Sequence, residues 1–185
     1  MNKDMRVAVT LRMLREGMIR CLKAKTLSKI TVSDLCNEAG VNRATFYNHY
    51  ESPAMILREL AYEYAGHLAD IYENNQEKAG KGDETALEKC LTYISERRAE
   101  IKILFSEHAE HYLSGVCLEI INEKAVQKAS SMSALDRKDE YLLLAAAVAS
   151  AIYGFVQIWL TKDIGKTPRE LVDILKRLAK GEPLL

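Results

Sequence analysis

Residues 31–50 read Thr-Val-Ser-Asp-Leu-Cys-Asn-Glu-Ala-Gly-Val-Asn-Arg-Ala-Thr-Phe-Tyr-Asn-His-Tyr, a pattern that predicts two short helices meeting at a sharp corner. Thr31 is suited to cap the first helix, and Asp34 follows three residues later, close to a capping box. Gly40 stands where a left-handed residue ends a helix. Asn42 is suited to cap the second helix. Such a corner is typical of a helix-turn-helix unit, although spacing alone fits two packed surface helices equally well.

Each of the two predicted helices has an apolar face and a polar face. The apolar residues of the first recur at helical spacing: Val32, Leu35, Cys36 and Ala39. On the second, Phe46 and Tyr50 lie four residues apart and are expected to face inward. The opposite face then carries polar groups suited to phosphate oxygens and base edges: Arg43, Thr45, Tyr47, Asn48 and His49.

The charge of the 185-residue chain is unevenly distributed, although its formal net charge is zero. Residues 1–50 hold nine Lys or Arg and four Asp or Glu, a balance of +5. The other 135 residues hold 17 basic and 22 acidic residues, a balance of −5. A basic N-terminal unit on an acidic body is expected if only the first unit contacts phosphate.

The remaining segments also show helical rather than strand periodicity. A helix is expected at 5–25, and Pro53 is expected to begin a helix to about residue 75, long enough to be shared by two domains. Loops are expected at 74–83 and 131–136, with helices at 84–98, 99–107, 108–130, 137–161 and from Thr167-Pro168 onward. The sequence thus predicts an all-α protein with a helix-turn-helix domain (1–52) and a larger helical domain (53–185) for regulation and dimerisation.

Residues 141–160 are apolar over about the length of a membrane span. Alanine, Ser150, Gly154 and Gln157 give this segment little drive to insert, so we expect a helix buried on one side by its own domain and on the other by a second subunit. Together with the last helix it predicts a four-helix dimer interface: Ala146, Ser150, Tyr153, Gly154, Gln157, Leu171, Ile174, Leu175 and Leu178. The N-terminus is charged and lacks a signal peptide, and the four widely spaced cysteines are expected to be buried free thiols; both features favour a cytoplasmic protein.

Three blocks of the opening stretch resemble the signature of the TetR/AcrR family of transcriptional regulators: Thr31-Val32-Ser33-Asp34-Leu35, Ala39-Gly40-Val41 and Thr45-Phe46-Tyr47-Asn48-His49-Tyr50. The likeness extends over about residues 5–65. A second motif is similar to a subgroup associated with dihydroxyacetone kinase operons, Ala151-Ile152-Tyr153-Gly154-Phe155 with Trp159-Leu160 and Thr167-Pro168. The resemblance implies an all-α homodimer that binds a palindromic DNA operator, with a larger domain that often holds a small-molecule effector.

The resemblance also implies which residues contact DNA. By position these are Thr31, Ser33, Arg43, Thr45, Tyr47 and His49, with Asn42 and Asn48 beside them. Arg43 has the chemistry to bond guanine, and Thr45 a base edge or a thymine methyl. The hydroxyls of Thr31 and Tyr47 and the ring of His49 suit phosphate oxygens.

One position departs from the family pattern. The family usually has a lysine after the serine that starts the fourth helix, and this chain has Pro53 there. One phosphate contact is therefore missing, and Lys29, Lys3 or Arg6 are candidates to replace it.

Candidates to line an effector pocket are mainly aromatic: Tyr64, His67, Leu68, Ile71, Phe105, His108, Tyr112 and Tyr153. His108 and His111 have a spacing that a metal site can use, but solvated helix-end residues explain it more simply. No catalytic or cofactor motif occurs, so we expect neither an enzyme nor a cofactor. Two alternatives stay open: a co-activator that works through a protein partner with weak DNA binding of its own, and a small helical enzyme.

Overall fold

The computed structural model describes residues 3–76, 84–109, 112–130 and 136–182. Within these ranges the chain is helical and contains no strand, which confirms the predicted all-α class. The elements are α1 (Lys3–Ala24), η1 (Leu27–Lys29), α2 (Val32–Ala39), α3 (Arg43–Tyr47), α4 (Pro53–Gln76), α5 (Glu84–Glu96), α6 (Arg98–Leu104), η2 (Glu107–Ala109), α7 (Tyr112–Ser130), α8 (Asp136–Thr161) and α9 (Pro168–Ala179).

Side chains and one glycine set the ends of α2 and α3 as the sequence predicts. Thr31 and Asp34 form a capping box at the start of α2, each accepting a hydrogen bond from the other's backbone N–H. Gly40 ends α2 in the left-handed conformation, with φ 65° and ψ 32°. Asn42 caps α3 by accepting from the N–H of Ala44 at 2.8 Å. The second helix is shorter than expected, because it ends at Tyr47.

The N-terminal three-helix unit, α1 to α3, packs around side chains that are fully buried: Leu14, Met18, Leu35 and Phe46. Its tightest contact is between α1 and α2 at Gly17. A β-carbon added to Gly17 would lie 2.8 Å from the Cβ of Ala39 and 3.1 Å from its Cα. A side chain at position 17 would therefore push α2 away from α1, which explains why glycine stands inside this helix.

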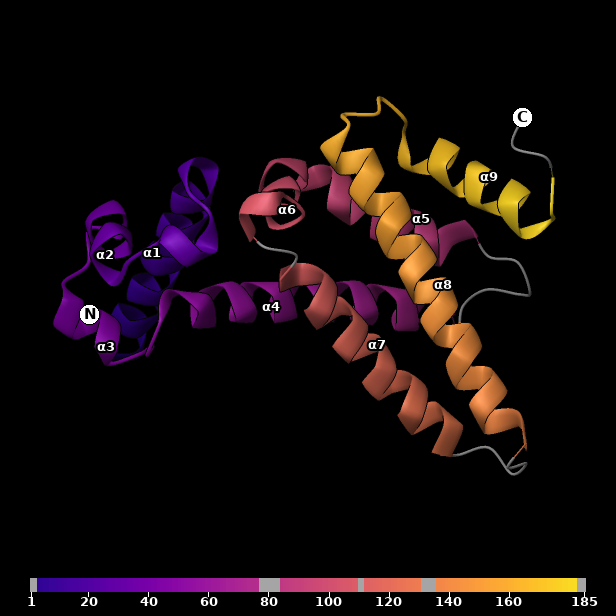
Figure 1. Cartoon of the computed structure of the whole chain (residues 1–185), viewed down its shortest axis with the longest axis horizontal. Helices are drawn as coiled ribbons and strands as arrows, with labels where there is room; N and C mark the ends of the chain where they lie inside the picture. Colours follow the sequence, from indigo (N-terminus) through magenta and orange to yellow (C-terminus); the bar gives the residue numbers. More distant parts are fainter. Residues whose placement is uncertain (1–2, 77–83, 110–111, 131–135, 183–185) are drawn as a thin grey trace.

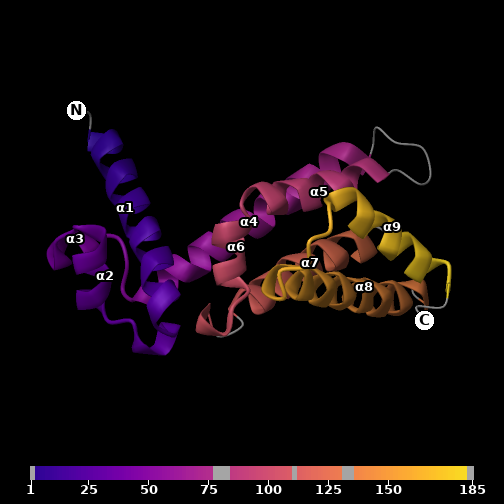
Figure 2. The same ribbon diagram turned by 90° about the horizontal axis from the view of Figure 1, so that it is seen from above.

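The long helix α4 connects the N-terminal unit to the rest of the molecule (Figures 1 and 2). Its 24 residues span about 36 Å. Ile56 and Leu57, in its first turns, are buried in the core that α1 lines, and that core continues to Trp159 and Leu160 of α8. Since the apolar core is continuous across α4, the proposed domain boundary at residue 52 stays a prediction.

The C-terminal helices pack in two groups around α4. One group is α7 with α8, and α7 also packs on α4; the other is α5 with α9, and α5 likewise contacts α4. We expected α9 beside α8, and residues of both helices line one groove; α9 also packs on α5, and its Leu171 and Val172 are buried. An open apolar groove of about 400 Å³ separates α8 from α9. The predicted loop at 74–83 and turn at 131–136 lie almost wholly outside the described residues, and α7 begins at Tyr112 rather than at 108.

The capping box that starts α9 is expected to make the stability of this helix depend on acid. A hydrogen bond from Lys166, then bonds from the hydroxyl and backbone N–H of Thr167, lower the pKa of Glu170 to about 2. A lowered carboxyl pKa stabilises the fold above the unfolded value of about 4.3, and this stabilisation is lost as pH falls toward 2. Glu170→Gln should therefore flatten the decline in melting temperature between about pH 5 and pH 2. An unchanged decline in a circular dichroism pH series would contradict this.

Candidate nucleic-acid interface

The outer face of α3 presents the polar groups that the sequence predicts. Phe46 is buried and fixes the helix, while the ring of Tyr47, edge-on to Phe46, is 60% exposed. Arg43 and Asn48 are exposed as well, and Thr45 and His49 are half-buried. The structure thus places the predicted α3 contact residues around one protruding corner.

The structure also brings Arg43 together with Ser33 of α2. An Nη of Arg43 donates to the Ser33 hydroxyl at 2.6 Å. Arginine is flexible, and such a bond reduces the number of conformations it samples before it meets a ligand. Ser33 therefore orients the guanidinium at the start of α3.

The hydroxyl of Thr31 is already used within the protein. It accepts from the N–H of Asp34 at 3.1 Å and donates to the Asp34 carboxylate at 2.7 Å. Lys25 donates to the same carboxylate at 2.8 Å. The bonds from Lys25 and Thr31 hold the pKa of Asp34 well below its usual range, so this charge persists at neutral pH. At Thr31 the groups left for an anion are the free N–H groups at the start of α2.

Ion pairs within the protein reduce the number of cations available to an anionic ligand. Arg12, Arg15, Arg20 and Lys25 each lie beside a carboxylate. Among the described side chains of residues 4–52, the basic groups without an ion pair are Arg6, Lys23, Lys29 and Arg43. Lys29 in η1 is exposed, while Pro53 begins α4 and supplies no charge. The free positive charge of the unit is therefore modest and local.

The predicted pocket residues make several separate contacts. Tyr64 donates to Glu100, and His67 Nδ1 lies 3.0 Å from the Tyr93 hydroxyl, both at the surface. Ile71 lines an open groove of about 510 Å³ between α4 and α5. The ring of Phe105 stacks on that of Tyr153 at 5.0 Å, and Leu68 and Tyr112 pack partly buried against the core.

His108 makes its contact with α1. Its Nδ1 is 2.8 Å from the backbone carbonyl of Leu22, near the end of α1. His111, whose spacing from His108 a metal site could use, lies outside the described residues. In the described ranges no group of three or more potential metal ligands occurs.

The predicted dimer residues lie on both sides of α8 and α9. Leu171 is buried and Tyr153 packs on Phe105, within their own chain. Ser150 and Leu178 are exposed, while Gly154 and Ile174 line the open groove. Ala146, Gln157 and Leu175 are half-buried.

An exposed apolar stripe lies along α8, and sequence reasoning, which expected this helix to face a second subunit, named only Gly154 of its residues for that contact. We call it the α8 stripe, and it comprises Leu144, Ala147, Val148, Ala151, Gly154, Phe155 and Ile158. Leu144 is 58% exposed, Val148 56% and Ile158 49%. Among the described helices only α8 is long and apolar enough to cross a membrane, with a mean hydropathy of 1.9 and 17% of its most apolar segment buried. The spacing of the stripe was visible in the sequence, but in an all-round apolar helix it did not show which face is covered.

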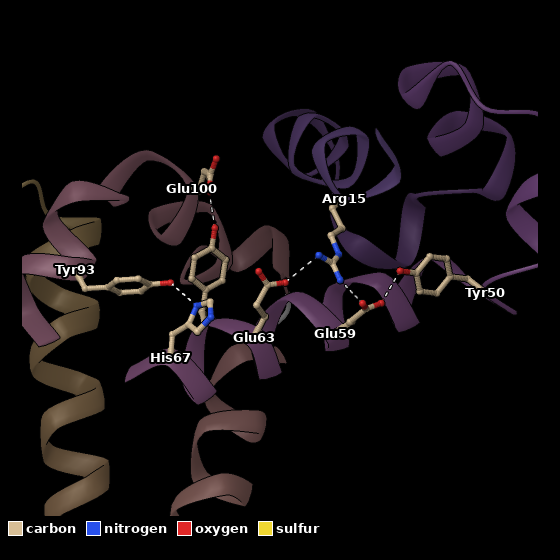
Figure 3. Close-up of polar contacts among 8 residues, drawn as sticks. Arg15, Tyr50, Glu59, Glu63, His67, Tyr93 and Glu100 are labelled. Atoms are coloured by element: carbon tan, nitrogen blue, oxygen red, sulfur yellow. Dashed lines mark hydrogen bonds and ion pairs between the residues drawn. The ribbon is translucent and has the colours of Figure 1, made fainter. Parts of the chain in front are cut away.

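A second feature missed by sequence reasoning is a polar cluster between α1 and α4 (Figure 3). Arg15 donates to Glu59 and forms an ion pair with Glu63, while the hydroxyl of Tyr50 donates to Glu59. We call these four residues the Arg15 cluster. A signal for it existed, since Arg15 interrupts the apolar positions of α1 between Leu14 and Met18.

Comparison with known proteins agrees with this architecture. The family profile TetR_C_8, described as "Transcriptional regulator C-terminal region", matches residues 84–181, more than half of the chain. No curated protein matches.

Among solved structures, a TetR transcriptional regulator from Streptococcus agalactiae 2603V has a TM-score of 0.68 at 22% identity, covering 95% of this chain and 96% of its own. The fatty acid degradation regulator FadR from Bacillus halodurans has a TM-score of 0.62 at 16% identity, covering 91% and 93%. The dihydroxyacetone kinase operon activator DhaS has a TM-score of 0.50 at 17% identity, covering 94% and 95%.

At these identities the solved structures support the fold, and the family follows from the profile match. The helix-turn-helix corner precedes the matched region in the chain, in the arrangement that the sequence resemblance implies. The chain belongs to the TetR family of transcriptional regulators.

Proposed function

We propose that this regulator is a homodimer that binds a palindromic operator and represses transcription by occupying it. The observation that carries the proposal is the outer face of α3, where Ser33 holds Arg43 beside the exposed Tyr47. An oriented guanidinium can bond O6 and N7 of guanine in the major groove, and a phenol can bond phosphate. Repression by occupancy needs only this contact and a second copy of the unit, and the protein then acts as a regulator rather than as an enzyme.

The α8 stripe is the surface on which we place the second copy. It continues into the open groove beside α9, whose lining includes Ile164 and Ile174. An apolar surface of this extent on a soluble chain marks an interaction site. Paired about a twofold axis, two stripes bring small residues such as Ala151 and Gly154 together and let the helices approach closely. The interface then also includes Ser150 and Leu178 of the predicted set.

We further propose that a small molecule releases the operator. Phe105, at the end of α6, stacks on Tyr153 of α8, and Tyr112 of α7 packs against the same core; these rings favour an apolar or aromatic effector. Its binding would change the angle of the N-terminal three-helix units through α4. Half-sites must lie about 34–36 Å apart or a multiple of this, so a shift of a few ångströms weakens binding.

The test is selection of bound fragments from genomic DNA with the purified full-length protein, followed by gel-shift titration at several salt concentrations. We expect an enriched inverted repeat whose affinity falls steeply with salt, because phosphate neutralisation releases counterions. A reporter downstream of that repeat should be silenced when the protein is present. Enrichment of no sequence would instead support a co-activator that acts through a protein partner.

Two substitutions on α3 should separate base reading from phosphate contact. Arg43→Ala is expected to reduce discrimination at one base pair by about 1–3 kcal/mol, because it removes the bidentate donor. Tyr47→Phe is expected to weaken binding to all DNA sequences by a similar factor, because a lost phosphate bond carries no sequence information. Gel shifts on the selected operator and its single-base variants measure both effects. Unchanged discrimination by Arg43→Ala would remove Arg43 from the base-reading role.

A further inference from the structure

The Arg15 cluster joins three segments that lie apart in the sequence. In Figure 3, Arg15 reaches from α1 between Glu59 and Glu63, which lie one turn apart on α4. Arg15 Nη2 donates to one oxygen of Glu59, and Nη1 lies 3.1 Å from an oxygen of Glu63. The hydroxyl of Tyr50, three residues after α3, donates to the other oxygen of Glu59. Glu59 therefore connects both α1 and the segment that follows α3 to α4.

The two carboxylates of this cluster are stabilised by its other members. Two carboxylates four residues apart on a helix repel each other, and the guanidinium between them offsets that repulsion. Partial burial opposes ionisation of Glu59, but the hydrogen bonds from Tyr50 and Arg15 outweigh it and lower its pKa. Burial, then the bond to Glu59, raises the pKa of Tyr50 to about 12, so its hydroxyl remains a donor at neutral pH. At neutral pH the Glu59 carboxylate is therefore ionised and accepts hydrogen bonds from both Arg15 and Tyr50.

This arrangement fixes the relative position of α1 and α4 more than it stabilises the folded state. The Nε of Arg15 is buried without a hydrogen-bond partner among the described residues, which costs free energy. Partly buried ion pairs often contribute little net stability, because desolvation offsets their attraction. They do fix one relative position of the elements that carry them. Here they fix α1 against two successive turns of α4.

A second contact attaches the other part of α1 to the C-terminal helices. His108 of η2 lies 2.8 Å from the carbonyl of Leu22. Leu22 is seven residues beyond Arg15, about 10 Å along the helix. Attachment at two points, on two different elements, prevents α1 from pivoting about either one.

We infer that Arg15 is a positioning residue for operator binding: it sets the orientation of the N-terminal three-helix unit on α4, and thereby the half-site spacing that the dimer accepts. The inference rests on the proposed function. A slip of α1 by one turn along α4 is about 5.4 Å, and base pairs rise about 3.4 Å each. Such a slip in each subunit changes the best spacing by more than one base pair.

The test compares the full-length protein with Arg15→Ala on two kinds of duplex. One is a series of operators in which the selected half-sites are moved apart or together by one or two base pairs, and the other carries a single half-site. We expect wild type to prefer one spacing by about tenfold or more, equivalent to about 1.4 kcal/mol. Arg15→Ala should reduce this preference to less than about threefold, while its single half-site affinity stays within about twofold of wild type.

Three further variants control for a merely structural effect. Arg15→Lys keeps the charge and should retain part of the preference, and Glu63→Gln should weaken it with less effect on the fold. Arg12→Ala removes a neighbouring arginine whose ion pair, within the described part of the chain, is with Glu16 of its own helix, and should leave the preference unchanged. Circular dichroism melts confirm that each variant is folded.

The outcomes separate this inference from the proposed function. An Arg15→Ala protein that keeps the wild-type spacing preference would overturn the positioning role. So would one whose affinity for a single half-site falls as much as its affinity for the full operator. If Arg15→Ala does not fold, retention of the full preference by Glu63→Gln overturns it instead. If wild type binds the half-sites without any spacing preference, the inference fails and DNA binding stands. If wild type binds no duplex, the proposed function itself fails.

Discussion

Replacing Gly17 by valine is expected to disrupt the N-terminal three-helix unit while leaving the C-terminal helices folded. The Cβ that any such side chain adds would lie 2.8 Å from the Cβ of Ala39 and 3.2 Å from its backbone nitrogen. Rotation of a side chain cannot relieve a contact with backbone, so α1 and α2 must separate. Overpacking of this kind costs about 1–3 kcal/mol or more, which is large for a unit of about 50 residues whose core is small.

Urea unfolding followed by circular dichroism, together with operator binding, measures the Gly17→Val effect. We expect an early transition that accounts for part of the helical signal, and loss of operator affinity. Gly17→Ala should have a smaller effect in the same direction, because the better helix propensity of alanine offsets part of the clash. Gly66→Ala is the matched control, since nothing lies within 4 Å of the added Cβ on α4. It should stabilise the protein by about 0.5–1 kcal/mol. If Gly17→Val unfolded in urea in the same way as wild type, α1 and α2 would be less closely packed than described.

The local features of the N-terminal unit were predictable because short-range chemistry determines them. Thr31, Asp34, Gly40 and Asn42 act within three residues of their own positions, through caps and one left-handed residue. The inward direction of Phe46 follows from helical period alone. Gly17 is different: its role depends on the residue that α2 places opposite it, and one sequence does not give the distance between two helices.

Contacts between distant elements account for what the sequence did not predict. Arg15 lies beside two carboxylates that α4 supplies, and residues so distant in the sequence give no local signal of this contact. The apolar face of α9 was assigned to a dimer; its Leu171 and Val172 are buried within their own chain, and α9 packs on α5. Helical periodicity could not settle either case, because an apolar face specifies burial but not the element that covers it.

Replacing Val148 by glutamate is expected to convert the proposed dimer into a monomer. Val148 is 56% exposed in the single chain, so the substitution leaves the fold of the monomer intact. In a pair of α8 stripes related by a twofold axis, each glutamate would enter an apolar interface, and the two charges would lie near each other. Desolvation of an unpaired charge costs several kcal/mol, so the dissociation constant should rise about a thousandfold or more.

Light scattering after size-exclusion chromatography at micromolar concentration measures this change as a halved molar mass. Operator affinity should fall with it, because the two half-sites are then bound independently rather than by linked units. Val126→Glu is the matched control, the same substitution at a 53% exposed valine of α7 outside the stripe, and should remain dimeric. A dimer that persists in Val148→Glu would place the second copy on another face. Because the affinity for a single half-site does not depend on dimerisation, its retention in Val148→Glu separates loss of assembly from damage to the N-terminal unit.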